Sequence, residues 1–158
     1  MKEGFSLRTA TVSDALSIFK LVNYYASQAQ MLPKSQNQIY QNIRDFLVIV
    51  DPDGQVAGCG ALHVLWSDLA EIRSLAVAEE HHRLGFGRIL VRRLLEDARK
   101  LGVPAVFALT YAPEFFASLG FSVIDKDSLP RKIWGDCIDC PKFPNCDEIA
   151  VIKDISKG

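Results

Sequence analysis

The sequence predicts a mixed β-sheet covered by helices, in the α/β (α+β) class. Short apolar runs typical of strands alternate with segments of helical periodicity, and three strands follow one another without a helix between them. The predicted order of elements is β-α-α-β-β-β-α-β-α-β-β. The run of sequential strands argues against a purely parallel, doubly wound sheet, and a mixed sheet flanked by helices is the economical architecture for this order.

The first half of the chain is predicted to form a strand at 6–10, helices at 13–28 and 37–45, and strands at 46–50, 56–66 and 69–77. Ser13 is the expected N-cap of the first helix. The buried stripe of that helix is expected at Leu16, Phe19, Val22 and Tyr25. The sequence Asp-Pro-Asp-Gly is a strong turn signal between the second and third strands.

The second half is predicted to form a helix from Gly87 to Leu101, a strand at 104–110, a helix at 113–120, and strands at 121–125 and 148–153. The long helix has an expected buried stripe of Ile89, Leu90, Leu94, Leu95, Ala98 and Leu101. No repeat or long linker interrupts these elements. A single domain over residues 1–158 is therefore expected, with a cysteine-containing segment, 134–147, inside it.

Composition narrows the classes of function. Of the 158 residues, 49% are hydrophobic and 23% are charged, as in an ordinary soluble globular protein. A formal net charge of −1 gives no support for binding to nucleic acid or to an anionic membrane. The sequence shows neither a signal-peptide pattern nor an apolar run of membrane-spanning length. The expectation is a cytoplasmic protein with small-molecule partners, and a homodimer is left open.

A glycine-containing loop stands before the long helix, in the sequence Glu-Glu-His-His-Arg-Leu-Gly-Phe-Gly-Arg-Ile-Leu. A dinucleotide fingerprint needs a third glycine where this chain has Leu90, and the Gly-Lys-Ser/Thr of a Walker loop is absent. A third interpretation is a short loop whose amides bind a pyrophosphate at the helix N-terminus, where the helix dipole also favours an anion. A glycine turn without a ligand is the alternative.

The flanks of this loop resemble the signature of the GNAT superfamily of acetyl-CoA-dependent N-acetyltransferases. In that family a strand ends in an apolar triplet, matched here by Leu75, Ala76 and Val77. A loop of the form Arg/Gln-x-x-Gly-x-Gly/Ala then opens a helix, matched by His82, Arg83, Leu84, Gly85, Phe86 and Gly87. The resemblance implies a GNAT fold in which the loop amides hold the coenzyme A pyrophosphate and the strand backbone pairs with the pantetheine arm. His82 departs from the Arg/Gln position, so Arg83 or Arg88 is expected to supply the positive charge.

Three further segments, AEIRSLAV, VFALTYAPEFFASLGF and VIDKDSLPRKIW, resemble the acetyltransferase domain of the N-acetylglutamate synthase family, in a short single-domain form. That resemblance implies acetyl transfer to the α-amine of L-glutamate, the first step of arginine biosynthesis. Lys34, Arg73, Arg131 and Lys132 are the expected cations for the glutamate carboxylates. Two alternatives stay open: a GNAT enzyme for another small amine or a protein N-terminus, and a coenzyme-A-binding or metal- and redox-sensing domain without activity.

The chemistry requires a base, because an amine near neutral pH is largely an ammonium ion and cannot attack a thioester. Glu71 is the candidate, since the synthase family has a glutamate there; a solvent-facing surface carboxylate is the alternative. Tyr111 is the nearest hydroxyl that can protonate the leaving thiolate, with an aromatic core residue as the alternative. Phe116 and Ala112 stand where many relatives carry hydroxyl groups. His63 is expected to be a packed or surface histidine and His81 a loop surface residue.

Cys137, Cys140 and Cys146 follow one another as C-x2-C-x5-C. The first pair has the spacing of metal ligands, but a closed zinc site needs four. Cys59, Asp147 or a histidine would have to complete such a site, and the sequence does not indicate which. Reduced thiols without metal are therefore the expectation, and a structural zinc is the alternative.

Overall fold

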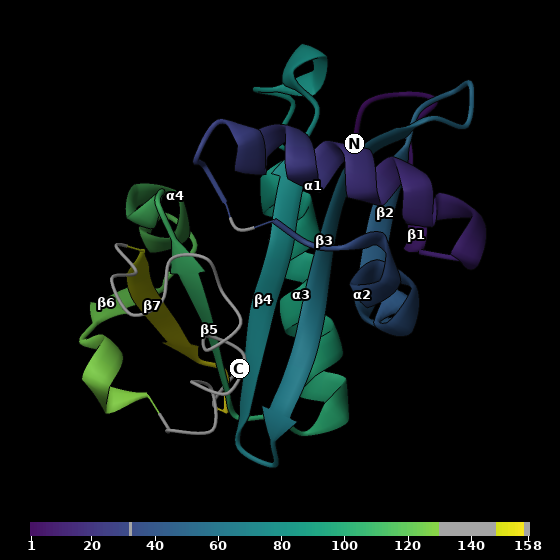
Figure 1. The fold of residues 1–158 in the computed structure, drawn as a ribbon. Coiled ribbons are helices and arrows are strands. Elements are labelled where there is room, and N and C mark those ends of the chain that lie inside the picture. Colours follow the sequence, from purple (N-terminus) through teal and green to yellow (C-terminus); the bar gives the residue numbers. More distant parts are fainter. Residues whose placement is uncertain (32, 130–147, 157–158) are drawn as a thin grey trace. The chain divides into compact units, whose positions relative to one another are not determined.

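The computed structural model describes residues 1–31, 33–129 and 148–156. Within these residues the elements are β1 (Ser6–Thr9), α1 (Ala15–Ser27), α2 (Gln36–Gln41), β2 (Phe46–Val50), β3 (Val56–Trp66), β4 (Leu69–Val77), α3 (Phe86–Leu101), β5 (Ala105–Thr110), α4 (Pro113–Ala117), β6 (Ser122–Ile124) and β7 (Ile149–Asp154). This is the predicted order of elements (Figure 1). The described strands form one mixed sheet in the order β1-β2-β3-β4-β5-β7-β6, with β4 and β5 parallel, so the predicted fold class is confirmed.

The chain divides into two compact units, each with a hydrophobic cluster of its own. The first unit comprises residues 1–63 and 72–97, and the second comprises residues 64–71 and 98–158. The strands β3 and β4 and the helix α3 contribute residues to both units.

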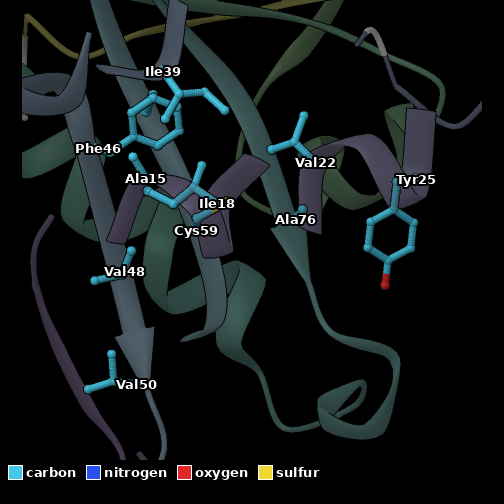
Figure 2. Close-up of a cluster of buried hydrophobic side chains, with 11 residues drawn as sticks. Ala15, Ile18, Val22, Tyr25, Ile39, Phe46, Val48, Val50, Cys59 and Ala76 are labelled. Carbon is cyan, nitrogen blue, oxygen red and sulfur yellow. The ribbon is translucent and has the colours of Figure 1, made fainter. Parts of the chain in front are cut away.

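In the first unit, helices cover both faces of the strands (Figure 1). β1 and β2, and β2 and β3, pair antiparallel, and α1 and α2 cover one face of them. The cluster on this face comprises Ala15, Ile18, Val22, Tyr25, Ile39, Phe46, Val48, Val50, Cys59, Ala61 and Ala76 (Figure 2). On the other face, Gly58 and Gly60 of β3 let α3 pack closely, because a Cβ at Gly58 would lie 3.4 Å from Leu90 Cδ1 of α3 and a Cβ at Gly60 would lie 3.3 Å from Leu94 Cδ1 of α3. A Cβ at Gly60 would also lie 3.1 Å from Leu75 Cδ1 of β4.

The start of α1 differs from the prediction. A 3-10 turn, Val12–Asp14, precedes the helix, so α1 begins at Ala15 with Asp14 as its N-cap residue, and the expected cap at Ser13 is wrong. The Asp14 carboxylate accepts an N–H bond from Thr11 at 2.8 Å and two bonds from the Arg8 guanidinium at 2.7 and 2.9 Å. These bonds, the Arg8 bond foremost, hold the pKa of Asp14 below its usual value, although burial opposes the shift.

Two expected members of the apolar stripes are also wrong. Leu16 is 46% exposed, because the buried positions of α1 are Ala15, Ile18, Val22 and Tyr25. Leu101, the last residue of α3, is 65% exposed. The buried face of α3 instead includes Phe86 at its first position, and Val91.

The second unit is built on β5, β6 and β7, which pair antiparallel around the central β7. Its cluster comprises Leu69, Phe107, Leu129 and Ala150. Lys153 of β7 donates from Nζ to the carbonyl of Leu119 at 2.8 Å, just beyond the end of α4. Gly120 follows with a φ of 90°, a left-handed conformation that suits glycine after a helix. No helix within the described ranges is both long and apolar enough to span a membrane.

Candidate active site

The loop between β4 and α3 has two residues in left-handed backbone conformations, one of them a glycine. After Val77 the chain forms a 3-10 turn, Glu79–His81, and then reaches α3 at Phe86. Arg83 and Gly85 both adopt left-handed conformations, with φ of 69° and 79°. A Cβ at Gly85 would meet nothing within 4 Å. Glycine at position 85 is therefore favoured by the backbone conformation and not by packing, and the space beside it is open.

The amide groups of this loop are available to a ligand. The first hydrogen bond of α3 joins Ile89 N–H to the Gly85 carbonyl at 3.0 Å. Within the part of the chain that the structure describes, the N–H groups of residues 83–87 have no backbone acceptor. Residues 86 and 87 open a 16-residue helix and residues 83–85 precede it, so these N–H groups form an environment that favours an anion, and the helix dipole adds to it.

Contacts among three aromatic rings pack the loop against the rest of the first unit. Phe86 is 1% exposed, so its ring belongs to the core. The Phe5 ring lies 5.0 Å from Phe86 and 5.1 Å from His81, between ring centroids. His81 lies in this loop, half-buried against Phe5. Phe86 and His81 hold the loop in place and leave ligand contact to the backbone.

Helix α1 also holds the loop, through Tyr24 and Tyr25, neither of which was expected at the site. Tyr25 O–H donates to the Val77 carbonyl and lies 2.9 Å from His82 Nε2, which is itself 2.9 Å from the same carbonyl. Tyr24 O–H donates to Glu79 at 2.6 Å. Burial, followed by the nearby Glu79 charge, raises the pKa of Tyr25. His82 is thus folded back toward β4.

The other residues matched to the loop divide into packing and exposed groups. Leu75 and Val77 contact the positions of Gly60 and Gly58 on the face that α3 covers, and Ala76 lies in the opposite cluster. Their side chains pack, so these three residues can offer a ligand only their backbone. Arg83 and Leu84 are exposed, and Arg88 on the first turn of α3 is half-buried.

The candidate base lies early in β4. Glu71 is 8% exposed, so the alternative of a solvent-facing surface carboxylate is wrong. Arg73 is half-buried and two residues further along the strand, so the two side chains share a face. Ser74 then adopts a φ of 55°, rare for a residue other than glycine in a strand, and its carbonyl accepts the Cys59 thiol at 3.3 Å. Burial raises the pKa of Cys59 to about 12, so this thiol stays neutral.

Lys34, one of the cations expected to bind the glutamate carboxylates, is half-buried just before α2. Asn23 of α1 fixes its backbone: the Asn23 amide donates to the Lys34 carbonyl at 2.9 Å and its Oδ1 accepts the Lys34 N–H at 3.3 Å. Ser35 then caps α2 in a capping box with Gln38. Asn23 carries no sequence signal for this role, because its partner is 11 residues away.

In the second unit, Tyr111 is half-buried between β5 and α4. The adjacent Thr110 is buried and its hydroxyl accepts the Ala112 N–H at 2.8 Å. Phe116 is 4% exposed and packs edge-on against Phe115 and Phe121, with centroids 5.2 and 5.1 Å away. At this position, where many relatives carry a hydroxyl group, the chain has an apolar side chain that packs among other phenylalanines.

The remaining candidates lie elsewhere. His63 Nδ1 is 3.0 Å from the Asp45 carboxylate, on a half-exposed surface, in line with a packed or surface histidine. Arg131, Lys132, Cys137, Cys140, Cys146 and Asp147 lie outside the described residues. Within the described residues, no group of three His, Cys, Asp or Glu side chains is arranged to hold a metal ion.

Comparisons with known proteins agree with this site. Residues 14–121 match the acetyltransferase (GNAT) family. An uncharacterized N-acetyltransferase of Chlorobaculum tepidum is 44% identical over 149 residues, which cover 94% of this chain and 96% of that protein. The amino-acid acetyltransferase of Mycobacterium tuberculosis is 42% identical over 132 residues, covering 82% of this chain and 75% of that protein.

A solved structure extends the comparison to bound molecules. N-acetylglutamate synthase from Neisseria gonorrhoeae, in complex with coenzyme A and N-acetyl-glutamate, superposes with a TM-score of 0.87 at 26% identity. The match covers 98% of this chain and 36% of that one. The fold and the matches to these relatives define a coenzyme-A-dependent acyltransferase. The chain belongs to the acetyltransferase (GNAT) family, and acetyl-CoA is its co-substrate.

Proposed function

We propose that this acetyltransferase transfers the acetyl group of acetyl-CoA to the α-amine of L-glutamate, giving N-acetylglutamate and coenzyme A in the cytoplasm. This is the reaction that opens arginine biosynthesis. Likeness to the amino-acid acetyltransferase and to the N-acetylglutamate synthase supports the acceptor. The observation that carries the proposal is the position of a buried carboxylate, Glu71, and a half-buried cation, Arg73, on one face of β4.

The proposed coenzyme site lies in the first unit. The N-H groups of residues 83–87 bind the pyrophosphate, and Arg83 and Arg88 supply positive charge. The pantetheine arm pairs with the backbone of β4, whose ladder to β5 includes Ala70–Val106 and Glu71–Phe107. His82 is bonded to the Val77 carbonyl and is left out of the phosphate contacts.

The proposed chemistry removes two protons from the acceptor nitrogen. Glu71 takes a proton from the ammonium group of the acceptor, directly or through one water, and the amine lone pair then attacks the thioester carbonyl carbon. The carbon–sulfur bond breaks as the carbon–nitrogen bond forms, and the nitrogen must then lose its second proton. Tyr111 relays that proton: it donates its own hydroxyl hydrogen to the thiolate and takes one from the nitrogen. The thiolate needs little help because a thiol has a pKa of about 8.5.

The proposed acceptor site presents cations to both glutamate carboxylates. Arg73 lies two residues from Glu71 on β4. The Asn23 side chain fixes the backbone of Lys34 through two hydrogen bonds. Arg131 and Lys132 complete the proposed set from outside the described residues. A site with these cations prefers glutamate to glutamine, since the amide leaves one of them unpaired, at a cost of about 1–3 kcal/mol.

The coenzyme loop is tested by a pair of glycine variants with matched backbones. Gly85 and Gly54 have φ of 79° and 81°, and a Cβ would meet nothing within 4 Å at either one. Gly85→Ala and Gly54→Ala should therefore lose similar stability, about 1 kcal/mol each from left-handed strain. Only Gly85→Ala should weaken coenzyme A binding in calorimetry, because relief of that strain shifts the amides. Equal affinity in both variants would reject the loop as the coenzyme site.

The acceptor is tested by thiol release from acetyl-CoA with glutamate, glutamine and an amine that has no carboxylate. Glutamate should be the preferred substrate. Lys34→Ala and Arg73→Ala should raise the KM for glutamate and leave the KM for acetyl-CoA unchanged. Similar rates on all three acceptors would reject the glutamate proposal and favour an acetyltransferase for another small amine or a protein N-terminus.

A further inference from the structure

The last carbonyl of β4 points away from its neighbouring strand β3. Ala78 N–H donates to the Ala57 carbonyl of β3 at 2.9 Å. The N–H and C=O of one trans peptide point in opposite directions, so the Val77 carbonyl, in the same peptide unit, points away from β3. This is the edge of β4 that the proposed pantetheine arm uses. The Val77 carbonyl is therefore the last acceptor on that edge before the phosphate loop begins.

Two side chains occupy the hydrogen-bonding sites of the Val77 carbonyl oxygen. Tyr25 O–H donates to it, and His82 Nε2 lies 2.9 Å from it. A carbonyl only accepts, so the Nε2 contact with Val77 is a hydrogen bond when the imidazole carries its hydrogen on Nε2; we infer this tautomer, because the Tyr25 hydroxyl, 2.9 Å from the same Nε2, already donates to the carbonyl. The Tyr25 and His82 rings are nearly parallel, at 15°, with centroids 6.2 Å apart. Both carbonyl lone pairs are thus taken by side chains.

The Tyr25 side chain is held firmly enough to position the loop. It is 7% exposed and belongs to the cluster of α1 and α2, and Figure 2 shows its hydroxyl turned away from the other side chains of the cluster. The preceding Tyr24 adds a second link from α1 to the same loop through Glu79. The loop is thereby fixed to the packed core at Val77, Glu79 and His82.

We propose that Tyr25 and His82 are positioning residues for coenzyme binding. Their hydrogen bonds occupy the Val77 carbonyl, so the strand edge open to the pantetheine arm ends there and the phosphate-binding amides begin. The same bonds hold residues 83–87 in their anion-binding conformation. His82 acts through its Nε2 hydrogen and not as a cation on the phosphates. This inference rests on the proposed coenzyme site.

The test compares Tyr25→Phe, which removes only the hydroxyl, with Tyr40→Phe, which removes one from an exposed tyrosine of α2. Tyr25→Phe should raise the KM for acetyl-CoA about threefold to tenfold, the worth of one or two net hydrogen bonds, with kcat and the acceptor KM unchanged. Tyr40→Phe should change none of the three. His82→Ala should act like Tyr25→Phe, and His82→Gln, whose amide can still donate to the carbonyl, should recover most of the loss.

Thermal unfolding of the same variants separates positioning from plain stability. A lower Tm in Tyr25→Phe with an unchanged KM for acetyl-CoA would overturn the inference and leave a structural tyrosine. An equally large loss in His82→Gln and His82→Ala would overturn the assigned role of the Nε2 hydrogen. If Gly85→Ala loses coenzyme A binding while the Tyr25 and His82 variants keep it, only this inference fails. If Gly85→Ala also keeps it, the coenzyme site itself fails.

Discussion

Glu71 is a buried carboxylate with an enclosed position on β4, and a carboxylate is costly to bury without interactions that stabilise it. Most acidic residues remain solvated at the surface, so they lose little hydration free energy when the chain folds. Burial alone does not single out Glu71, because Asp14 and Glu148 are also buried, at 6% and 5% exposed. Asp14 is bonded to Arg8 at the start of α1, whereas Glu71 shares a face of β4 with Arg73, and this position suits the proposed proton transfer.

Glu71→Gln should lower kcat on the order of 10²–10⁴-fold, because the amide keeps the shape of the side chain but cannot accept the proton. Acetyl-CoA affinity should hardly change. The matched control is Glu96→Gln on the exposed face of α3, which should keep full activity. Turnover by Glu71→Gln close to that of the control, measured across the pH profile, would remove Glu71 from the reaction.

Residues with a local sequence signal could be predicted, whereas residues whose partners are distant in the chain could not. Gly85 was found because a glycine before a helix is a local pattern, and its left-handed φ confirms that the backbone favours it. Tyr25 and Asn23 were not assigned to the site. Tyr25 contacts Val77, 52 residues away, and only the folded chain brings such pairs together. His82 matched the family loop, but only the structure shows that it turns toward β4.

Helix and strand boundaries were predictable where one sequence signal marks them and not where several residues could mark the same boundary. The strands β2, β3 and β4 have the predicted bounds, because each is an apolar run delimited by turn residues. The start of α1 was misplaced because Thr11, Ser13 and Asp14 are all good caps within four residues. The Arg8 bonds to Asp14 select the outcome, and Arg8 lies on a strand that the helix pattern does not include.

Close packing of α3 on β3 depends on small residues at two positions, and they are not equivalent. A Cβ at Gly60 would lie within 3.1 and 3.3 Å of Leu75 and Leu94, whereas at Gly58 the nearest atoms are 3.4 Å away or more. Gly60→Ala should lower the free energy of unfolding by about 1–2 kcal/mol through overpacking. Gly58→Ala, the matched control, should be close to neutral in urea denaturation. Equal effects of the two variants would contradict this account of the helix–strand contact.

At the scale of the whole molecule, the element order was sufficient to predict a mixed sheet. Three strands in succession require antiparallel neighbours, and a helix between β4 and β5 permits their parallel pairing. The strand order β5-β7-β6 was not predictable in the same way. β7 pairs between two earlier strands, and that insertion depends on contacts across the second unit and not on any local pattern.

Stability of the whole chain in acid should depend on Asp14, whose pKa is lowered chiefly by Arg8. A lowered pKa in the folded state stabilises the protein above the unfolded value of about 3.9, and this contribution is lost as the pH falls through the folded pKa. Asp14→Asn should therefore cost about 1–3 kcal/mol at pH 7, and the difference from wild type should shrink below pH ~4. Urea denaturation from pH 7 to pH 3 measures this, with Asp53→Asn in the exposed turn as the control that shows no such trend. A difference between wild type and Asp14→Asn that stays constant over the whole range would show that the Arg8 bonds do not link folding to the charge of Asp14.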